Sequence, residues 1–418
     1  SLNHVAIPQS EIHHCHPLCL WSLNLKAEPP SPKYLSALHH NKIAHSSILS
    51  RFVIPSTPEI RIPDTDIGPG HGVQRVGMAN SWVDNFPGTA RPFLDEMDDT
   101  LGFNLSRTIA NGPNCELNKT ENSQPAIMAT SILILRILEK EFGFDTKSRV
   151  NVTLGHSLGE FSALVAGGYL KFRDALRLVR RRAEIMAECT RQASKQSGED
   201  YGMVALICEP AHLESLLSAI HEFTGHPSPD LKDDSSHGLP TIQQVMIANI
   251  NSKNQIVLSG SIHRITTLLI QLRQFGGHDP RAVRLKSESP FHNPIMAPAA
   301  GYMRHELEHI DIEFPSQLPC ISNVSGLPFE SRDDLKNLLS RQCVETVKWW
   351  DSIRYLDQDR GVKRWIGIGP GKVGRNLVGK EVGKINTKGG GVWALSDPRE
   401  LENVLMALQN TEIDVLTQ

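Results

Sequence analysis

The sequence predicts an α/β protein in which strands and helices alternate from residue 67 onward. Helical apolar periods alternate there with short runs of β-branched residues, which is the pattern of a mixed α/β fold. A short apolar alternation, Val150, Val152 and Leu154, also leads directly into a glycine-rich turn and a helix-compatible stretch at 161–166. These two observations predict a strand, a sharp turn and a helix in immediate succession.

The turn at residues 155–160 reads Gly-His-Ser-Leu-Gly-Glu and is typical of a nucleophile elbow, which lifts a serine hydroxyl clear of a sheet. Glycines two residues either side of Ser157 allow a tight turn and a close approach by a substrate carbonyl. The helix that follows would direct its free N–H groups at an oxyanion. A turn whose serine only caps a helix is the alternative, and this motif alone does not decide between the two.

Composition excludes several classes of protein. A chain of 418 residues is long enough for more than one subdomain. The net charge of −3 argues against a nucleic-acid partner, and no run of apolar residues is long enough to predict a membrane span. The seven cysteines are scattered and odd in number, which favours reduced thiols.

Residues 1–66 differ from the rest of the chain. Most of this segment is rich in His, Pro and Ser, poor in acidic residues, and without a sustained period. We therefore expect a leader that is disordered or serves in targeting. Its bunched histidines and cysteines at 13–19 match no structural zinc spacing, so we expect no metal site.

Two long helices are predicted in the first part of the core. The first spans 124–142, with a proline near its first turn and a glycine after its end. The second spans 174–188 and carries one apolar stripe, made by Leu176, Val179, Ala183 and Met186. Arg180 and Arg182 flank the two edges of this stripe, so either could reach inward.

Residues 202–286 predict a separate unit with the order strand, helix, strand, strand, helix, strand, which is the ferredoxin-like pattern. The six elements are expected at 203–208, 211–221, 245–250, 255–259, 262–275 and 282–285. A polar insertion at 224–240 is predicted to be a surface loop. The core is expected to resume at 287–418, with strands at 320–324 and 365–368.

A serine hydroxyl needs a base to become a nucleophile, so the elbow demands a histidine elsewhere in the chain. The best candidate is His292, because Pro290 and Pro294 on either side favour an extended turn that presents one side chain rigidly. A surface histidine is the alternative, since the chain has 18 of them.

The order of these motifs resembles the malonyl-CoA:acyl carrier protein transacylase family. The elbow is followed by Arg182 and then by Pro290-Phe291-His292, and further similar segments stand in family order at 70–78, 117–126, 249–260 and 369–372. The resemblance covers about residues 67–410. It implies an α/β-hydrolase-like core with a parallel sheet, built from 67–201 and 287–418, into which the ferredoxin-like subdomain of residues 202–286 is inserted.

The resemblance also implies a ping-pong transfer. Ser157, deprotonated by His292, would attack malonyl-CoA, release CoA, and pass the malonyl group to the phosphopantetheine thiol of an acyl carrier protein. A backbone carbonyl near Lys348 would orient His292, and the N–H groups of Leu158 and His71 would form the oxyanion hole. No cofactor is implied besides the CoA thioester, which is a substrate.

Substrate contacts follow from the same resemblance. Arg182 would grip the free malonyl carboxylate, which a planar guanidinium can do through two parallel hydrogen bonds. Gln124 and Asn249 would line the pocket, with a structural role as the alternative for both, and Phe291 would narrow the pocket against a methyl branch. His71 stands where the family usually has glutamine. The segment 61–68 before it contains two acids and a proline, which a central strand should not contain.

Two other functions stay open at this point. A serine esterase or thioesterase would share the elbow, although it would leave Arg182 without a role. A non-catalytic relative that only binds the carrier protein is the other possibility, because the segment 61–68 lacks the apolar pattern that the family has in its first strand. We expect a monomeric, discrete enzyme of mitochondrial fatty-acid synthesis that contacts neither nucleic acid nor membrane, with the cytoplasm and the plastid as alternative locations.

Overall fold

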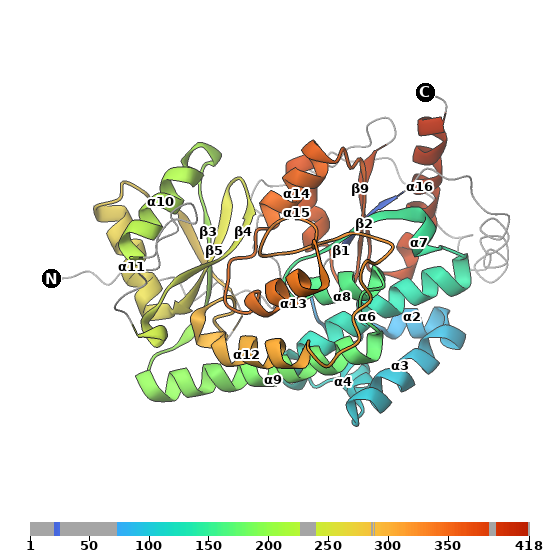
Figure 1. Cartoon of the computed structure of the whole chain (residues 1–418), viewed down its shortest axis with the longest axis horizontal. Coiled ribbons are helices and arrows are strands. Elements are labelled where there is room, and N and C mark those ends of the chain that lie inside the picture. Colours follow the sequence, from blue (N-terminus) through green and yellow to red (C-terminus); the bar gives the residue numbers. More distant parts are fainter. Residues whose placement is uncertain are drawn as a thin grey trace, which may run out of the picture.

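The computed structural model describes residues 73–225, 240–285, 287, 289–383 and 390–416, and it also gives the path of a short strand at residues 21–25. Two parts are distinguished in Figure 1, a core on the right and a smaller sheet with two helices on the left. Helix α9 (Phe172–Ser197) leads from the core to the small sheet. The expected α/β class is confirmed.

The sheet of the core has five strands in the order β7-β2-β1-β8-β9. β2 pairs in parallel with β7, and β8 pairs in parallel with β9. The central strand β1 is antiparallel to both of its neighbours, β2 and β8. The strands are β1 (Trp21–Leu25), β2 (Val150–Gly155), β7 (Cys320–Ile321), β8 (Arg364–Ile368) and β9 (Gly391–Leu395).

The central position of β1 differs from the expectation for residues 1–66, which included no strand. Trp21 lies opposite Gly155 of β2, and Ser22 lies opposite Gly367 of β8. The sequence of β1 alternates apolar and polar residues, as a strand requires, whereas the segment 61–68 carries two acids and a proline. The stronger strand pattern therefore takes the place between β2 and β8.

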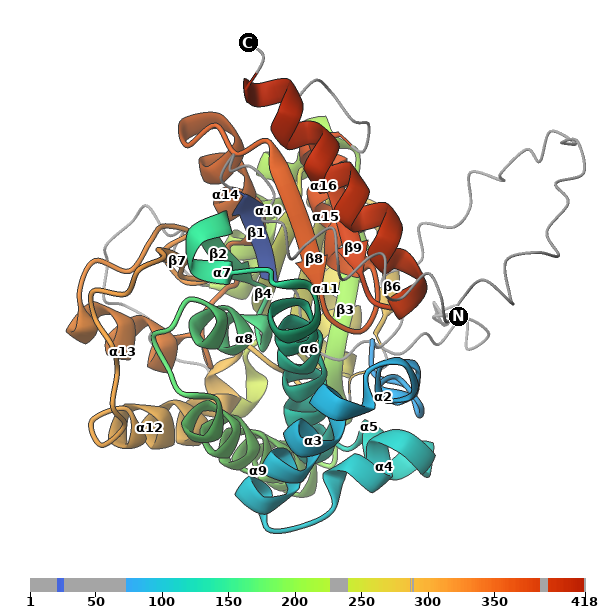
Figure 2. The same ribbon diagram turned by 90° about the vertical axis from the view of Figure 1, so that its right-hand side faces the viewer.

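Helices cover both faces of the core sheet. α6 (Thr120–Phe142) is buried along most of its length and is surrounded by α3 (Pro87–Leu101), α4 (Leu105–Asn111) and α9 (Figure 2). It begins four residues before the predicted position, so Pro125 lies inside the helix; the Glu121 carbonyl, which the missing N–H of Pro125 cannot reach, accepts instead from Arg180 Nη1 at 2.7 Å. On the outer side, α16 (Leu401–Leu416) packs against β9 (Figure 2).

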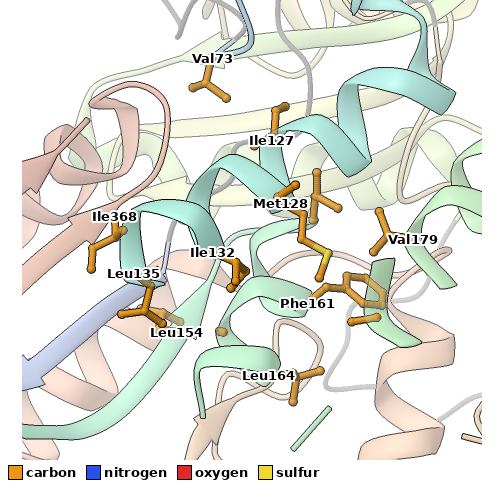
Figure 3. Close-up of a cluster of buried hydrophobic side chains, with 14 of the residues drawn as sticks. Val73, Ile127, Met128, Ile132, Leu135, Leu154, Phe161, Leu164, Val179 and Ile368 are labelled. Carbon is orange, nitrogen blue, oxygen red and sulfur yellow. The ribbon is translucent and has the colours of Figure 1, made fainter. Parts of the chain in front are cut away.

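The remaining helices of the core are short. They are α2 (Asn80–Asn85), α3 (Pro87–Leu101), α4 (Leu105–Asn111), α5 (Asn114–Asn118), α7 (Thr146–Arg149), α8 (Gly159–Ala166), α12 (Ala297–Glu306), α13 (Arg332–Arg341), α14 (Trp349–Arg354) and α15 (Val373–Val382). Figure 3 shows how apolar side chains of α6 fill the space between the sheet and α8. Ile132 and Leu135 lie there with Leu154 of β2 and Phe161 of α8. This packing fixes the start of α8 relative to the end of β2.

The small sheet is entirely antiparallel, with the order β4-β5-β3-β6. Its elements follow the predicted ferredoxin-like order: β3 (Tyr201–Ile207), α10 (Leu213–Thr224), β4 (Met246–Ser252), β5 (Gln255–Ser261), α11 (Ile262–Gln274) and β6 (Arg281–Arg284). It has an apolar cluster of its own, separate from that of the core. Most of the predicted surface loop at 224–240 lies outside the described residues.

Within the described ranges, none of the helices combines the length and the apolar character that crossing a bilayer requires.

Candidate active site

Ser157 lies in the sharp turn between β2 and α8, with a φ of 52° that non-glycine residues rarely adopt. Glycine is required before it, because a Cβ on Gly155 would overlap the backbone of Gly159. Asn323 braces the turn from the other side. Its Oδ1 accepts the Ser157 N–H at 2.6 Å, and its Nδ2 donates to the Gly155 carbonyl at 2.6 Å. The strained serine is thus held by a side chain 166 residues away in sequence.

His292 is the partner of this serine. Its Nε2 lies 2.8 Å from the Ser157 Oγ, and both residues are almost fully buried. Like Ser157, His292 has a positive φ, of 56°. The structure therefore brings together the two residues that the sequence predicted as nucleophile and base.

The carbonyl that orients His292 belongs to Gln342 and not to the region of Lys348. The Nδ1–H of His292 donates to the Gln342 carbonyl at 2.7 Å. Gln342 caps the C-terminus of α13, where the last carbonyls have no partner within the helix. The Lys348 carbonyl instead accepts hydrogen bonds from Ser352 at the start of α14. The prediction of a carbonyl near Lys348 was therefore wrong, because the acceptor lies at Gln342, just before the segment that leads to α14.

Burial and, to a smaller extent, the positive charge of Arg182 lower the pKa of His292 from its ordinary value of 6.5 to about 3. His292 is therefore neutral at neutral pH. Because its Nδ1 carries the proton that the Gln342 carbonyl accepts, its Nε2 presents a lone pair to the Ser157 hydroxyl. This is the tautomer that a general base needs.

Arg182 is buried in α9, with 1% of its surface exposed. Its two terminal nitrogens donate to the side-chain oxygens of Gln124 and Gln342, each at 2.8 Å. Its guanidinium also lies 5.3 Å from the ring centre of Phe161. No carboxylate among the described residues is within ion-pair distance of it. A buried cation whose hydrogen-bond partners are neutral side chains is a site prepared for an anion.

Glu160 and Gln342 link these groups, and sequence reasoning did not assign them to the site. The Gln342 Nε2 donates to the Ser157 carbonyl at 2.8 Å and to Glu160 Oε2 at 2.7 Å. Burial raises the pKa of Glu160 to about 8, although the hydrogen bonds it accepts and the charge of Arg182 oppose the shift. Glu160 belongs to the Gly-His-Ser-Leu-Gly-Glu motif and could have been suspected, whereas no motif distinguishes Gln342 or Asn323.

His156 connects the elbow to the small subdomain. Its Nε2 lies 2.9 Å from Asn251 Oδ1 on β4, and its ring packs edge-on against Trp349 with centroids 5.1 Å apart. Burial lowers the pKa of His156 to about 4. This contact joins the two parts of the molecule directly behind the nucleophile.

The remaining residues predicted for the site are not all placed at it by the structure. The N–H of Leu158, at the start of α8, has no acceptor among the described residues and is free to bind an oxyanion. His71 lies outside the described residues. Asn249 is buried in β4, where its backbone forms a bridge with Val347. Phe291 is buried beside His292. In the described part of the chain, no group of three or more His, Cys, Asp or Glu side chains could hold a metal.

Comparisons with known proteins identify the family. A family model described as an acyl transferase domain matches residues 67–215. The malonyl CoA-acyl carrier protein transacylase of Bacillus subtilis is 36% identical to this chain over 341 residues, which is 82% of this chain and 96% of that protein. The chain belongs to the malonyl CoA-acyl carrier protein transacylase family. It is therefore an acyltransferase, as the resemblance predicted.

Other members of the transacylase family support this assignment. The enzyme of the same name from Haemophilus influenzae is 30% identical, covering 76% of this chain and 91% of that protein. The solved transacylase structure from Clostridium perfringens has a TM-score of 0.67 at 31% identity, covering 83% of this chain and 97% of that one. A malonyl-transacylase solved in complex with a type II polyketide acyl-carrier protein has a TM-score of 0.65 at 28% identity, covering 81% of this chain and 97% of that one.

Proposed function

We propose that this chain transfers a malonyl group from malonyl-CoA to the phosphopantetheine thiol of an acyl carrier protein, through a malonyl ester on Ser157. One observation carries the proposal beyond family membership. The Ser157–His292 pair shares a neighbour, Gln342, with a buried arginine that has no carboxylate partner among the described residues. A nucleophile close to such a buried cation suits an acyl group that ends in a carboxylate.

In the first half-reaction, His292 Nε2 takes the proton of the Ser157 hydroxyl while Oγ attacks the thioester carbonyl. The Leu158 N–H points from the start of α8 and stabilises the oxyanion, a contribution typically worth about 10²–10³ in rate. The C–S bond then breaks, and the CoA thiolate leaves with the proton from His292. The product is malonyl-Ser157.

The second half-reaction reverses the roles. The thiol of the carrier protein enters where CoA left, and His292 takes its proton. The thiolate attacks the ester carbonyl, the C–Oγ bond breaks, and His292 returns the proton to Ser157. Both half-reactions need the same neutral imidazole, which the low pKa of His292 maintains.

Selection of malonyl over acetyl falls to Arg182. The amide oxygens of Gln124 and Gln342 hold the guanidinium in place, and its Nε–H has no acceptor among the described residues, so the malonyl carboxylate would accept there. An acetyl group offers no acceptor there and leaves the cation with neutral partners only. The carboxylate also offsets the charge that depresses the pKa of His292, so the bound substrate would strengthen its own base.

A serine esterase remains the second candidate function, because it uses the same pair of residues. Water would have to reach an ester at Ser157, which is 2% exposed. Family membership favours transfer over hydrolysis. The intact hydrogen bond between Ser157 and His292 likewise favours a catalyst over a non-catalytic carrier-protein binder.

One labelling experiment tests the proposal. The protein is incubated with radiolabelled malonyl-CoA or acetyl-CoA, and the label on Ser157 is followed by peptide mapping. We expect strong malonyl labelling that is lost only when acyl carrier protein is added. Absence of label from either thioester would refute the transferase, and rapid loss of label to water without carrier protein would establish a hydrolase.

The monomeric state and the mitochondrial location stay predictions. Light scattering of the purified protein tests the first, and the position of a fluorescent fusion in cells tests the second.

A further inference from the structure

Glu160 is a buried carboxylate that neither half-reaction uses. It lies in the first turn of α8 with none of its surface exposed. A buried carboxylate is costly unless its oxygens are well satisfied, so its presence in the site calls for a role. The positive end of the α8 dipole stabilises a negative charge at this position.

Each oxygen of Glu160 accepts one hydrogen bond from a different part of the site. Oε1 accepts the backbone N–H of Asn323 at 3.0 Å, and Oε2 accepts the side-chain Nε2 of Gln342 at 2.7 Å. A backbone N–H and an amide nitrogen can only donate. Burial favours the protonated form of Glu160, but both of these contacts, together with the charge of Arg182, oppose that rise in its pKa. Because both partners can only donate, the observed geometry is that of the carboxylate, which accepts at both oxygens.

The contact with Glu160 fixes which way the Gln342 amide points. Its Nε2 faces two acceptors, Glu160 and the Ser157 carbonyl, while its Oε1 accepts from Arg182 at 2.8 Å. A flipped amide would set its oxygen against a carboxylate and a carbonyl, and its NH₂ against a guanidinium. Every one of these contacts would be repulsive, so only one orientation is stable.

We propose that Glu160 is a positioning residue for malonyl selection, which holds the Gln342 amide in the orientation that keeps Arg182 placed for the substrate carboxylate. This inference rests on the proposed malonyl transfer. Gln342 also orients His292 through its backbone carbonyl, and Asn323 braces Ser157. Glu160 thus holds Asn323, which braces Ser157, and Gln342, which contacts both His292 and Arg182.

The test is the variant Glu160→Gln, which keeps the size of the side chain but offers one acceptor in place of two. Either Asn323 N–H or Gln342 Nε2 then faces another donor, so the orientation of the Gln342 amide is no longer fixed. We expect the ratio of kcat/KM for malonyl-CoA over acetyl-CoA to fall about tenfold. Most of the change should be a raised KM for malonyl-CoA, because binding through Arg182 is affected more than proton transfer.

A matched control is available in Glu139, a half-buried glutamate of α6 that accepts a hydrogen bond from Thr146 at 2.8 Å. Glu139→Gln should leave the malonyl to acetyl ratio unchanged. The conservative variant Glu160→Asp keeps the charge with a shorter reach and should retain more selectivity than Glu160→Gln. An equal loss of selectivity in both Glu160 variants would mean that the size of the side chain decides the result. It would contradict the role proposed for the orientation of the Gln342 amide.

A double-mutant cycle tests whether Glu160 acts through Gln342. Gln342→Met removes the amide but keeps the backbone carbonyl that orients His292. If the inference is correct, the double variant loses no more selectivity than Gln342→Met alone. Additive losses would contradict it. If Glu160→Gln does not fold, Gln342→Met decides the question, since wild-type selectivity in that variant would overturn the inference.

The outcomes separate this inference from the proposed function. A wild-type protein that takes no malonyl label would refute the transferase itself. A labelled wild-type protein, together with a folded Glu160→Gln variant of unchanged selectivity, would refute only the role of Glu160.

Discussion

The small subdomain and the core bury different kinds of side chain. The small sheet encloses an apolar cluster that includes Leu206, Leu216 and Leu258. In its described residues no Asp, Glu, Lys, Arg or His side chain is buried. The core buries Arg182 and Glu160 besides its apolar cluster, and Ser157 and His292 are the described non-glycine residues with positive φ. The small subdomain is thus organised for stability, while the core accepts strain and buried charge that function requires.

The largest expected effect is the loss of transfer activity in Ser157→Ala, a variant of the core that should keep its stability. Ser157→Ala removes the nucleophile but keeps the backbone and the bracing by Asn323. We expect transfer activity to fall by about 10⁴-fold or more. The melting temperature should stay close to that of the wild type, because a single hydroxyl contact is lost. Malonyl transfer assays and thermal unfolding measure the two effects, and a large loss of stability would contradict the comparison.

The opposite result is expected in the small subdomain. Leu258→Ala opens a cavity at a fully buried position of β5, and we expect the free energy of unfolding to fall by about 2–5 kcal/mol. The malonyl to acetyl ratio should not change at temperatures where the variant is folded. Leu269→Ala, at a half-buried position of α11, is the matched control and should cost less. Urea unfolding and substrate competition provide the two measurements.

The small subdomain and the core also differ in how well the sequence predicts them. Every element of the small sheet was predicted to within a few residues, because each strand carries its own apolar pattern. In the core, Ser157 and His292 were found from motifs. The central strand β1 was not predicted, because pairing with β2 and β8 depends on which of two distant segments competes better. Gln342 was missed because its role arises from contacts with residues far away in sequence.

Substrate selection should respond to one arginine of α9 and not to its neighbour. Arg182→Ala removes the buried guanidinium, and we expect kcat/KM for malonyl-CoA to fall about 10²-fold while acetyl-CoA is affected little. Arg181→Ala is the control, since that side chain is exposed and pairs with Glu184 at 2.9 Å. Steady-state kinetics with both thioesters checks the result. If Arg182→Ala keeps its preference for malonyl-CoA, the carboxylate is bound elsewhere.

A pH dependence of stability is predicted from the buried histidine behind the nucleophile. The pKa of His156 is about 4 in the folded protein, below its ordinary value of 6.5. As the pH falls below 6.5, the unfolded chain binds a proton at this position and the folded chain does not. Stability contributed by neutral His156 is therefore lost between pH 6.5 and about 4, by about 1.4 kcal/mol for each pH unit.

The variant His156→Gln isolates the contribution of His156 to the free energy of unfolding, because the titrations of His292 and Glu160 remain in both proteins and cancel in the difference. The free energy of unfolding is measured by urea titration at several pH values from 7.5 downward. The wild type should lose stability relative to His156→Gln only below pH 6.5. His263→Gln removes an exposed histidine of the small subdomain and controls for the loss of an imidazole as such. Parallel curves for wild type and His156→Gln would mean that His156 binds a proton as readily in the folded core as in the unfolded chain, which would contradict the prediction.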